Sequence, residues 1–251
     1  MMPHVRHSHQ SCMTILTPEQ LTGRASNHVA LVGPEGLRLH PGAAQALNAL
    51  AAEAAAYDIE LAATSGFRDF GRQLAIWNGK FSGQRPLLGA RGEALDVGQM
   101  EEEGIVRAIL TWSALPGASR HHWGSELDVY DKAALAPGAQ PQLLPSEYAR
   151  DGVFARLADF LRTAAAGHGF FLPYDRDRGG VAPEPWHLSY APVSGVALPA
   201  LTLDVLREAL RGVQLGGMAV VQRLLPEIHE RYVCRVATPP ASALTPAARP
   251  S

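Results

Sequence analysis

Short strand-like segments and longer helical segments follow one another along this chain in an irregular order. Residues 125–130 alternate polar and apolar side chains, which suits a half-buried strand, and residues 59–65 and 186–190 also read as strands. The clearest amphipathic helix spans residues 146–166, where apolar residues recur on one face. Because the helices and strands do not alternate as βαβ units, the pattern predicts an α+β fold in which helices flank a small antiparallel sheet.

Local signals predict the remaining elements. Pro41 suits the first turn of a helix. Further helices are predicted over residues 41–57, 70–78, 101–115, 203–212 and 217–230, and a short strand is predicted after Gly169. Residues 79–98 are rich in Gly, Pro and Arg and are expected to form a long irregular loop, and such loops in compact domains are often functional.

The 251 residues are enough for one large domain, or for one domain with an appendage. The predicted division is a flexible N-terminal segment over residues 1–25, a main domain over 26–195, a C-terminal helical extension over 196–237 that packs on the domain, and a disordered tail over 238–251. The tail is assigned because it is rich in proline and has no hydrophobic periodicity.

Charge and composition exclude several classes of protein. The formal net charge of -2 gives no basic excess for binding nucleic acid. No stretch approaches the ~18 apolar residues of a membrane span, and no secretory signal is readable, which by itself predicts a cytoplasmic protein. A periplasmic or cell-envelope location would need another export route.

Cys12 and Cys234 are expected to be separate thiols, although a bridge between them is possible. The oligomeric state is not predicted.

His121 and Asp128 are spaced as two ligands of one metal ion. Gly124 permits a tight turn from the loop of His121 into the strand that carries Asp128, and alternation places Glu126 on the same face as Asp128. A buried carboxylate needs a partner, and a metal ion is one such partner. Taken alone, both residues are more often ordinary surface or core residues, and His122 is an alternative ligand.

Glu184 and His187 suit a base beside a metal ligand. Residues three apart in a straight strand point to opposite faces. Pro185 belongs at the start of a strand because it cannot donate to the ladder, so Glu184 is expected in the preceding loop, on the same side as His187. Taken alone, the pair is more often a surface glutamate and a core histidine.

Arg68 follows a strand that ends at Ser65 and Gly66, so its guanidinium is expected on a loop where it can reach a carboxylate or an oxyanion. Gln73 follows five residues later. A catalytic zinc needs three protein ligands and an open position for water, and hydrolysis also needs a base and a group that stabilises negative charge. The three segments offer each of these parts.

Together, these segments resemble the LAS-type zinc peptidases, and within them the D-alanyl-D-alanine carboxypeptidases and dipeptidases of bacterial cell-wall metabolism. The family pattern S-x-H-x-x-G-x-x-x-D, followed by E-x-W-H and preceded by S-G-[YF]-R, is matched here by Ser119, His121, Gly124 and Asp128, by Glu184, Trp186 and His187, and by Ser65, Gly66, Phe67 and Arg68. The similarity covers about half of the chain, and its register favours His121 over His122.

The resemblance implies a role for each residue. His121, Asp128 and His187 would bind Zn²⁺, Glu184 would be the catalytic base, Arg68 would polarise the scissile carbonyl, and Ser119 and Gln73 would contact the substrate. The chain departs from the family at Glu126, where relatives often have alanine or another small residue; this carboxylate could support Arg120 or His122, or face water.

The activity implied is a zinc-dependent carboxypeptidase that hydrolyses the terminal peptide bond of D-Ala-containing peptidoglycan stem peptides. Two alternatives are also enzymes: an L,D-endopeptidase and a dipeptidase of free D-Ala-D-Ala. A third alternative is a zinc-bearing binding module without turnover, against which Glu184 and Arg68 count, since such a module needs no base.

Overall fold

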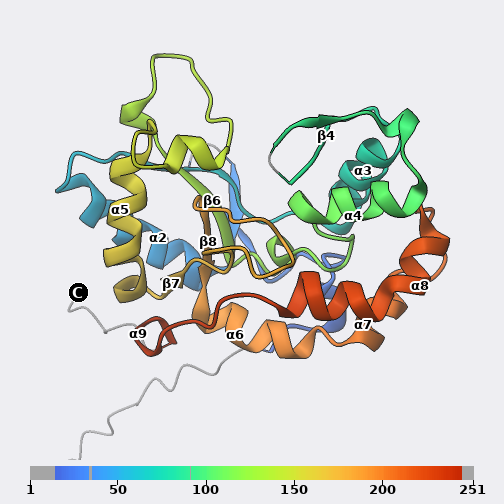
Figure 1. Cartoon of the computed structure of the whole chain (residues 1–251). Helices are drawn as coiled ribbons and strands as arrows, with labels where there is room; N and C mark the ends of the chain where they lie inside the picture. The colour runs from blue at the N-terminus through green and yellow to red at the C-terminus, as the bar shows by residue number, and fades with distance from the viewer. Residues whose placement is uncertain (1–14, 34–35, 91, 245–251) are drawn as a thin grey trace, which may run out of the picture.

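A four-stranded antiparallel sheet forms the centre of the computed structural model, which describes residues 15–33, 36–90 and 92–244. Its strands lie in the order β3 (Leu61–Ser65), β6 (Glu126–Asp131), β8 (His187–Tyr190) and β7 (Phe170–Phe171). Helices lie on both sides of it (Figure 1). The α+β prediction, with a small antiparallel sheet flanked by helices, is therefore confirmed.

One hydrophobic core joins the sheet to α2 (Pro41–Ala55) and α5 (Ala155–Ala164). Leu127 and Val129 of β6 and Leu188 of β8 are fully buried in this core. Because side chains alternate along a strand, the intervening residues of β6 and β8 face the opposite side of the sheet. That opposite face carries the candidate site.

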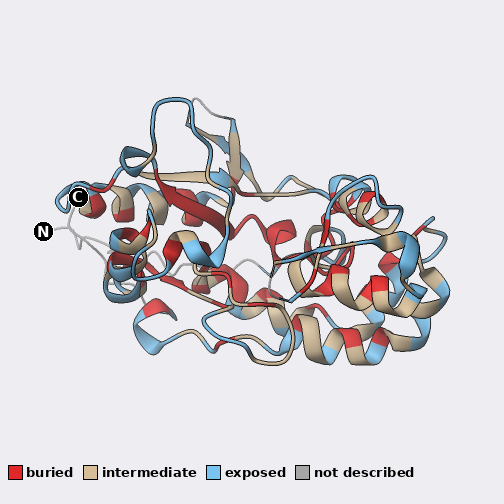
Figure 2. Cartoon of the chain, turned by 45° about the horizontal axis from the view of Figure 1, so that its top comes forward, coloured by how far each residue is buried: buried red, intermediate tan, exposed pale blue. Residues whose placement is uncertain are grey.

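A second core joins α3 (Phe70–Phe81) and α4 (Glu102–Trp112) to α6 (Ala191–Ala200), α7 (Leu203–Ala209) and α8 (Met218–Ile228). Its fully buried members include Trp77, Ile109, Leu206 and Val221. Buried residues gather on the central strands and on the inward faces of the helices (Figure 2). The C-terminal helices therefore share a core with α3 and α4, and the division of the chain into domains stays a prediction.

Smaller elements complete the described chain. They are α1 (Pro18–Leu21), the hairpin of β1 (Ala30–Val32) and β2 (Leu37–Leu39), the hairpin of β4 (Leu87–Leu88) and β5 (Ala94–Leu95), α9 (Ala241–Leu244), the π-helical segment His229–Cys234, and the 3₁₀ segments Val97–Gln99, Arg120–Trp123, Lys132–Ala134, Pro145–Tyr148 and Ala165–His168.

The single helix predicted over residues 146–166 is wrong. The chain instead forms a 3₁₀ turn at Pro145–Tyr148, an irregular segment, and then α5. A Cβ atom at Gly152 would clash with the carbonyl oxygens of Ser146 and Glu147, so the chain folds back on itself at this glycine. This fold-back places Phe154 in the core, and its N–H donates to the carbonyl of Glu147 at 2.7 Å.

Three other predictions differ from the structure, and one helix was not predicted. Residues 18–21 of the expected flexible segment form α1, because Thr17 and Gln20 make a capping box and Leu21 is buried. The 79–98 region contains the end of α3, a hairpin and a 3₁₀ turn rather than a loop throughout. No helix was predicted at α6, which contains prolines at residues 192 and 199. Residues 241–244 of the expected tail form α9, with Ala243 buried.

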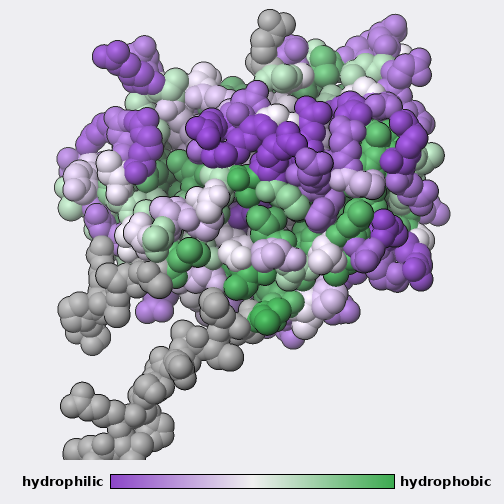
Figure 3. Space-filling model, turned by 60° about the horizontal axis from the view of Figure 1, so that its bottom comes forward, coloured by the Kyte–Doolittle hydropathy of each residue, from purple (hydrophilic) through white to green (hydrophobic). Residues whose placement is uncertain are grey.

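The described helices include none that is both long and apolar enough to cross a membrane. Hydrophilic and hydrophobic residues are mixed on the face shown in Figure 3. Cys234 is an exposed free cysteine among the described residues, and Cys12 lies outside them, as do residues 1–14 and 245–251 of the two predicted end segments.

Replacing Phe154 with alanine is expected to lower the free energy of unfolding by about 3–5 kcal/mol, because a cavity would replace a large buried ring. Phe154 is fully buried and packs against Tyr148 at a centroid distance of 5.0 Å. Urea denaturation measures the loss. The neighbouring Val153 is 46% exposed, so Val153→Ala should change stability by no more than about 0.5 kcal/mol. Equal losses of unfolding free energy in the two variants would contradict the fold-back at Gly152 that places Phe154 in the core.

Candidate metal centre and active site

The strand register places three polar side chains in a row across the sheet. Ser65 of β3 pairs with Asp128 of β6, and Asp128 pairs with His187 of β8. Directly opposed residues share a face, so their side chains lie within contact distance. Ser65 Oγ donates to Asp128 Oδ2 at 2.5 Å, and His187 Nδ1 lies 3.3 Å from Asp128 Oδ1. Asp128 is thus held between its two neighbours.

His121 reaches the same carboxylate from the turn that precedes β6. It lies in the 3₁₀ segment Arg120–Trp123, which ends at Gly124 with φ of +67° before the chain enters the strand. His121 Nδ1 lies 2.8 Å from the carbonyl oxygen of Gly66, to which it can donate, and its Nε2 lies 3.5 Å from Asp128 Oδ2. A Cβ atom at residue 66 would lie 2.7 Å from the Arg38 carbonyl oxygen, so the close packing of this turn against β2 needs glycine.

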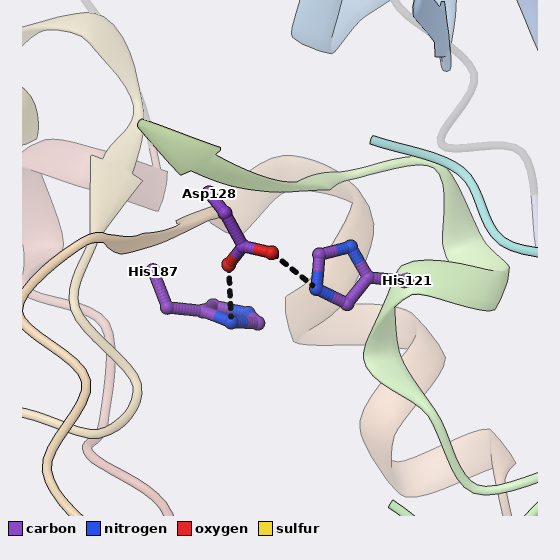
Figure 4. A group of neighbouring side chains, drawn as sticks. All are labelled: His121, Asp128 and His187. Atoms are coloured by element: carbon purple, nitrogen blue, oxygen red, sulfur yellow. Dashed lines mark ion pairs between the residues drawn. The ribbon is translucent and has the colours of Figure 1, made fainter. Parts of the chain in front are cut away.

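His121, Asp128 and His187 form a compact group of candidate metal ligands (Figure 4). One ligand atom from each lies within 4.8 Å of the others, and all three residues are buried. Among the described residues, Asp128 Oδ1 is one of the few buried side-chain oxygen or nitrogen atoms without a hydrogen-bond partner. The Asp128 carboxylate faces an imidazole nitrogen of His187 through Oδ1 and one of His121 through Oδ2. This arrangement fits a metal ion, since carboxylate oxygens and imidazole nitrogens bind Zn²⁺ in proteins.

The electrostatics of the group suit a metal ion. Burial lowers the pKa of His121 to about 3, so its imidazole is neutral. Burial alone would raise the pKa of Asp128, but the neighbouring histidines and Ser65 outweigh it and hold that pKa below its ordinary value. Burial alone would lower the pKa of His187, but the close carboxylates of Asp128, Glu126 and Glu184 raise it well above its ordinary value. A proton and a metal ion would therefore compete for His187 Nδ1.

Glu184 lies in the loop before β8, as the sequence predicted. Its Oε2 atom lies 3.1 Å from His187 Nδ1, on the metal side of the ring. The Glu184 backbone is fixed at both groups, because its N–H donates to the Tyr174 carbonyl and its carbonyl accepts from the N–H of His187. Burial raises the pKa of Glu184, against a smaller lowering by His187. A carboxylate with a raised pKa is suited to accept a proton.

Arg68 is tied to the turn that carries His121. Its N–H donates to the His121 carbonyl at 3.1 Å, and its own carbonyl accepts from His122 Nδ1 at 2.6 Å. Its guanidinium donates through Nη1 to Gln73 Oε1 at 2.9 Å. Burial lowers the pKa of Arg68, although Asp128 and Glu184 raise it in part. The guanidinium thus lies beside the carboxylates of the candidate site.

The structure gives Gln73 a different place from the one predicted. Its side chain is fully buried, and its amide also donates to the Ala114 carbonyl at 2.7 Å. Gln73 therefore orients Arg68 and does not line the pocket. Ser119 does line the pocket, as a substrate contact would require.

His122, the alternative ligand, points away from the metal group. It is fully buried, its Nε2 accepts from the N–H of Gly117 at 3.1 Å, and its Nδ1 donates to the Arg68 carbonyl. Both ring nitrogens are therefore occupied by the backbone. Gly23 packs so closely on this ring that a Cβ atom there would clash with it. The spacing of the family pattern, which favours His121 over His122 as the metal ligand, agrees with this geometry.

A pocket of about 750 Å³ lies over the group. Its wall includes Arg68, Ser119, Glu184 and the three candidate ligands, and also the side chains of Trp112, Leu144 and Tyr174. Pockets of this size hold drug-sized ligands. The pocket can therefore hold an organic substrate and a metal ion next to the carboxylate of Glu184.

Sequence reasoning missed several groups at this site. The sequence pattern alone assigns Ser65 and Gly66 no contact at the site, although Ser65 holds Asp128 and Gly66 holds His121. Tyr174 packs on His187 with ring centroids 5.0 Å apart, and burial raises the pKa of Tyr174 to about 12. Nothing in the sequence around Tyr174 indicated this position, because it lies in an irregular loop.

Residues 36–193 match the family model of the D-alanyl-D-alanine carboxypeptidase VanY. The chain belongs to this family. The predicted membership of the LAS-type zinc peptidases and the predicted metallopeptidase class are therefore confirmed, and the alternative of a binding module without turnover is disfavoured.

Two uncharacterized proteins of Haemophilus influenzae are similar in sequence. One is 34% identical over 125 residues, which are 49% of this chain and 95% of the relative. The other is 42% identical over 103 residues, which are 40% of this chain and 70% of the relative.

The solved structures that are similar to this chain have lower sequence identities. VanYB in complex with D-alanine-D-alanine is 20% identical, with 77% of this chain and 87% of that chain covered and a TM-score of 0.45. The D,D-pentapeptidase VanY in complex with Zn(II) is 21% identical, with 74% and 93% covered and a TM-score of 0.47. The LD-carboxypeptidase LdcB is 21% identical, with 75% and 79% covered and a TM-score of 0.48. Similarities this distant do not decide the substrate.

Proposed function

We propose that this chain is a zinc-dependent carboxypeptidase that removes the terminal residue from D-Ala-containing peptidoglycan stem peptides. The observation that carries the proposal is the convergence of His121, Asp128 and His187 beside Glu184 and Arg68 in one pocket. Family membership supports peptidase chemistry, and the ligand atoms support zinc.

Two imidazole nitrogens and one carboxylate oxygen make a donor set typical of catalytic zinc, which keeps a position open for water. When bound, zinc lowers the pKa of water and polarises a carbonyl group. Each histidine directs one ring nitrogen toward the proposed zinc position, Nε2 in His121 and Nδ1 in His187. The other nitrogen of His121 faces the Gly66 carbonyl, and the other nitrogen of His187 faces a carboxylate.

The chain's own residues would move the proton and stabilise the charge. Glu184 Oε2 would accept the proton of the attacking water and then deliver it to the leaving amine. Arg68 would donate to the carbonyl oxygen of the scissile bond as negative charge develops there. Gln73 would act through Arg68, because its Oε1 accepts from that guanidinium. Ser119, in the pocket wall, would contact the substrate.

The size of the pocket favours a stem peptide over a free dipeptide. At about 750 Å³ it accommodates a drug-sized ligand, which is larger than D-Ala-D-Ala. Apolar wall residues such as Ile76, Leu88 and Val181 would contact the uncharged parts of a longer peptide. A carboxypeptidase therefore agrees better with this pocket than a dipeptidase.

Incubation of the zinc-loaded protein with pentapeptide, tetrapeptide and free D-Ala-D-Ala, followed by mass spectrometry, tests the proposal. Loss of one terminal residue from the pentapeptide is expected. Cleavage of the tetrapeptide alone would indicate an L,D-specific enzyme, and cleavage of the free dipeptide alone would indicate a dipeptidase; either result would overturn the proposed substrate. A Glu184→Gln sample run in parallel controls for contaminating peptidases.

A further inference from the structure

Glu126 is a buried carboxylate directly behind the candidate metal ligands. Its side chain is fully buried and accepts hydrogen bonds from four residues. Oε1 accepts from the hydroxyls of Ser125 and Ser189 at 2.9 Å each. Oε2 accepts from Arg120 Nε at 3.1 Å. The fourth hydrogen bond joins Oε2 to His187 Nε2 at 2.9 Å.

The hydrogen bond to His187 decides which nitrogen of this ring keeps its lone pair. A carboxylate only accepts, so the contact places a proton on Nε2. The lone pair of the neutral ring then lies on Nδ1, which is 3.3 Å from Asp128 Oδ1 and 3.1 Å from Glu184 Oε2. The ring therefore directs Nδ1 toward the metal group and Nε2 toward Glu126.

Arg120 supplies the countercharge that such a buried carboxylate needs. It is itself buried, its Nη2 donates to Ser189 Oγ at 2.6 Å, and its guanidinium lies 4.7 Å from the ring centre of Trp123. Arg120, Glu126 and Ser189 thus form one connected hydrogen-bonded group. This group fixes the position of the carboxylate under His187.

We propose that Glu126 is a positioning residue for the metal centre, which orients His187 with Nδ1 facing the ion and increases its strength as a ligand. A carboxylate that accepts from a metal-bound histidine has both effects. The other histidine differs, because His121 faces the neutral carbonyl of Gly66. The inference rests on the proposed metal site, in which His187 is a ligand.

The test compares zinc dissociation constants, measured by competition with a chromophoric chelator, for the full chain and four variants. Glu126→Gln keeps the size of the side chain and removes its charge. Arg120→Met with Glu126→Gln also removes the buried cation. Glu53→Gln is the matched control, because Glu53 pairs with His168 at 2.8 Å in another part of the fold. His187→Ala reports on the metal site itself. The absorption spectrum of the Co²⁺-substituted protein gives a second readout of ligand geometry.

Glu126→Gln is expected to weaken zinc binding by about 10–100-fold and to alter the Co²⁺ spectrum. The double variant should bind as weakly, and Glu53→Gln should bind like the wild type. Wild-type affinity in Glu126→Gln would overturn the inference. Wild-type zinc affinity in the double variant would also overturn the inference, because the weaker binding of Glu126→Gln would then come from an unpaired Arg120.

The variants also separate this inference from the proposed function. If Glu126→Gln fails to fold because Arg120 is left unpaired, the double variant carries the comparison. Wild-type zinc affinity in His187→Ala would overturn the metal site, and the role of Glu126 with it. Loss of zinc in His187→Ala together with unchanged binding in both Glu126 variants would overturn only the role of Glu126.

Discussion

Glu184→Gln is expected to lower kcat by about 10²–10⁴-fold while the zinc content stays at the wild-type level. The amide keeps the size of the side chain but cannot accept the proton of the attacking water. Zinc is retained because the proposed ligands are His121, Asp128 and His187, which the substitution leaves in place. Steady-state kinetics on the pentapeptide and elemental analysis of the same samples measure the two effects.

Glu101→Gln is the control for the loss of a carboxylate. Glu101 is exposed and precedes α4 without a side-chain capping hydrogen bond, so its replacement should change neither kcat nor zinc content. Full activity in Glu184→Gln would remove Glu184 from the role of base. Loss of zinc in this variant would instead make Glu184 a part of the metal site.

His187→Ala is expected to lose zinc and activity together. His187 Nδ1 is one of three proposed ligand atoms, and two ligands hold a metal ion much less tightly than three. Loss of the ion removes several kcal/mol of transition-state stabilisation, which corresponds to a rate decrease on the order of 10³-fold or more. Elemental analysis after dialysis and kinetics on the pentapeptide are the measurements, and His121→Ala should behave in the same way.

His229→Ala is the control for the loss of an imidazole. His229 follows α8 and its Nε2 contacts the Leu201 carbonyl at 2.8 Å, in the C-terminal part of the chain. This variant should keep zinc and activity. Circular dichroism of each variant shows whether the fold is retained. Folded His187→Ala with a full complement of zinc would show that the ion is bound elsewhere.

Local sequence signals determined most of the elements that carry the site. Pro41 begins α2, Asp69 caps α3 through the Arg72 N–H at 2.7 Å, and alternation along residues 126–131 separates the buried apolar side chains from Glu126 and Asp128. These signals act over a few residues, so they can be read without the fold. The candidate ligands and the base were also predicted from the sequence, through the spacing of residues in two short segments and their resemblance to a family.

Tertiary structure alone decided which of the polar residues work together. Ser65, Asp128 and His187 become neighbours only because β3, β6 and β8 pair in one register, and sequence periodicity does not encode register between distant strands. For the same reason, the sequence could not decide whether Glu126 contacts Arg120, His122 or water. In the structure its carboxylate accepts hydrogen bonds from Arg120 and His187. The break before α5 likewise depends on a close contact between Gly152 and two preceding carbonyls, which a helical pattern of apolar residues cannot reveal.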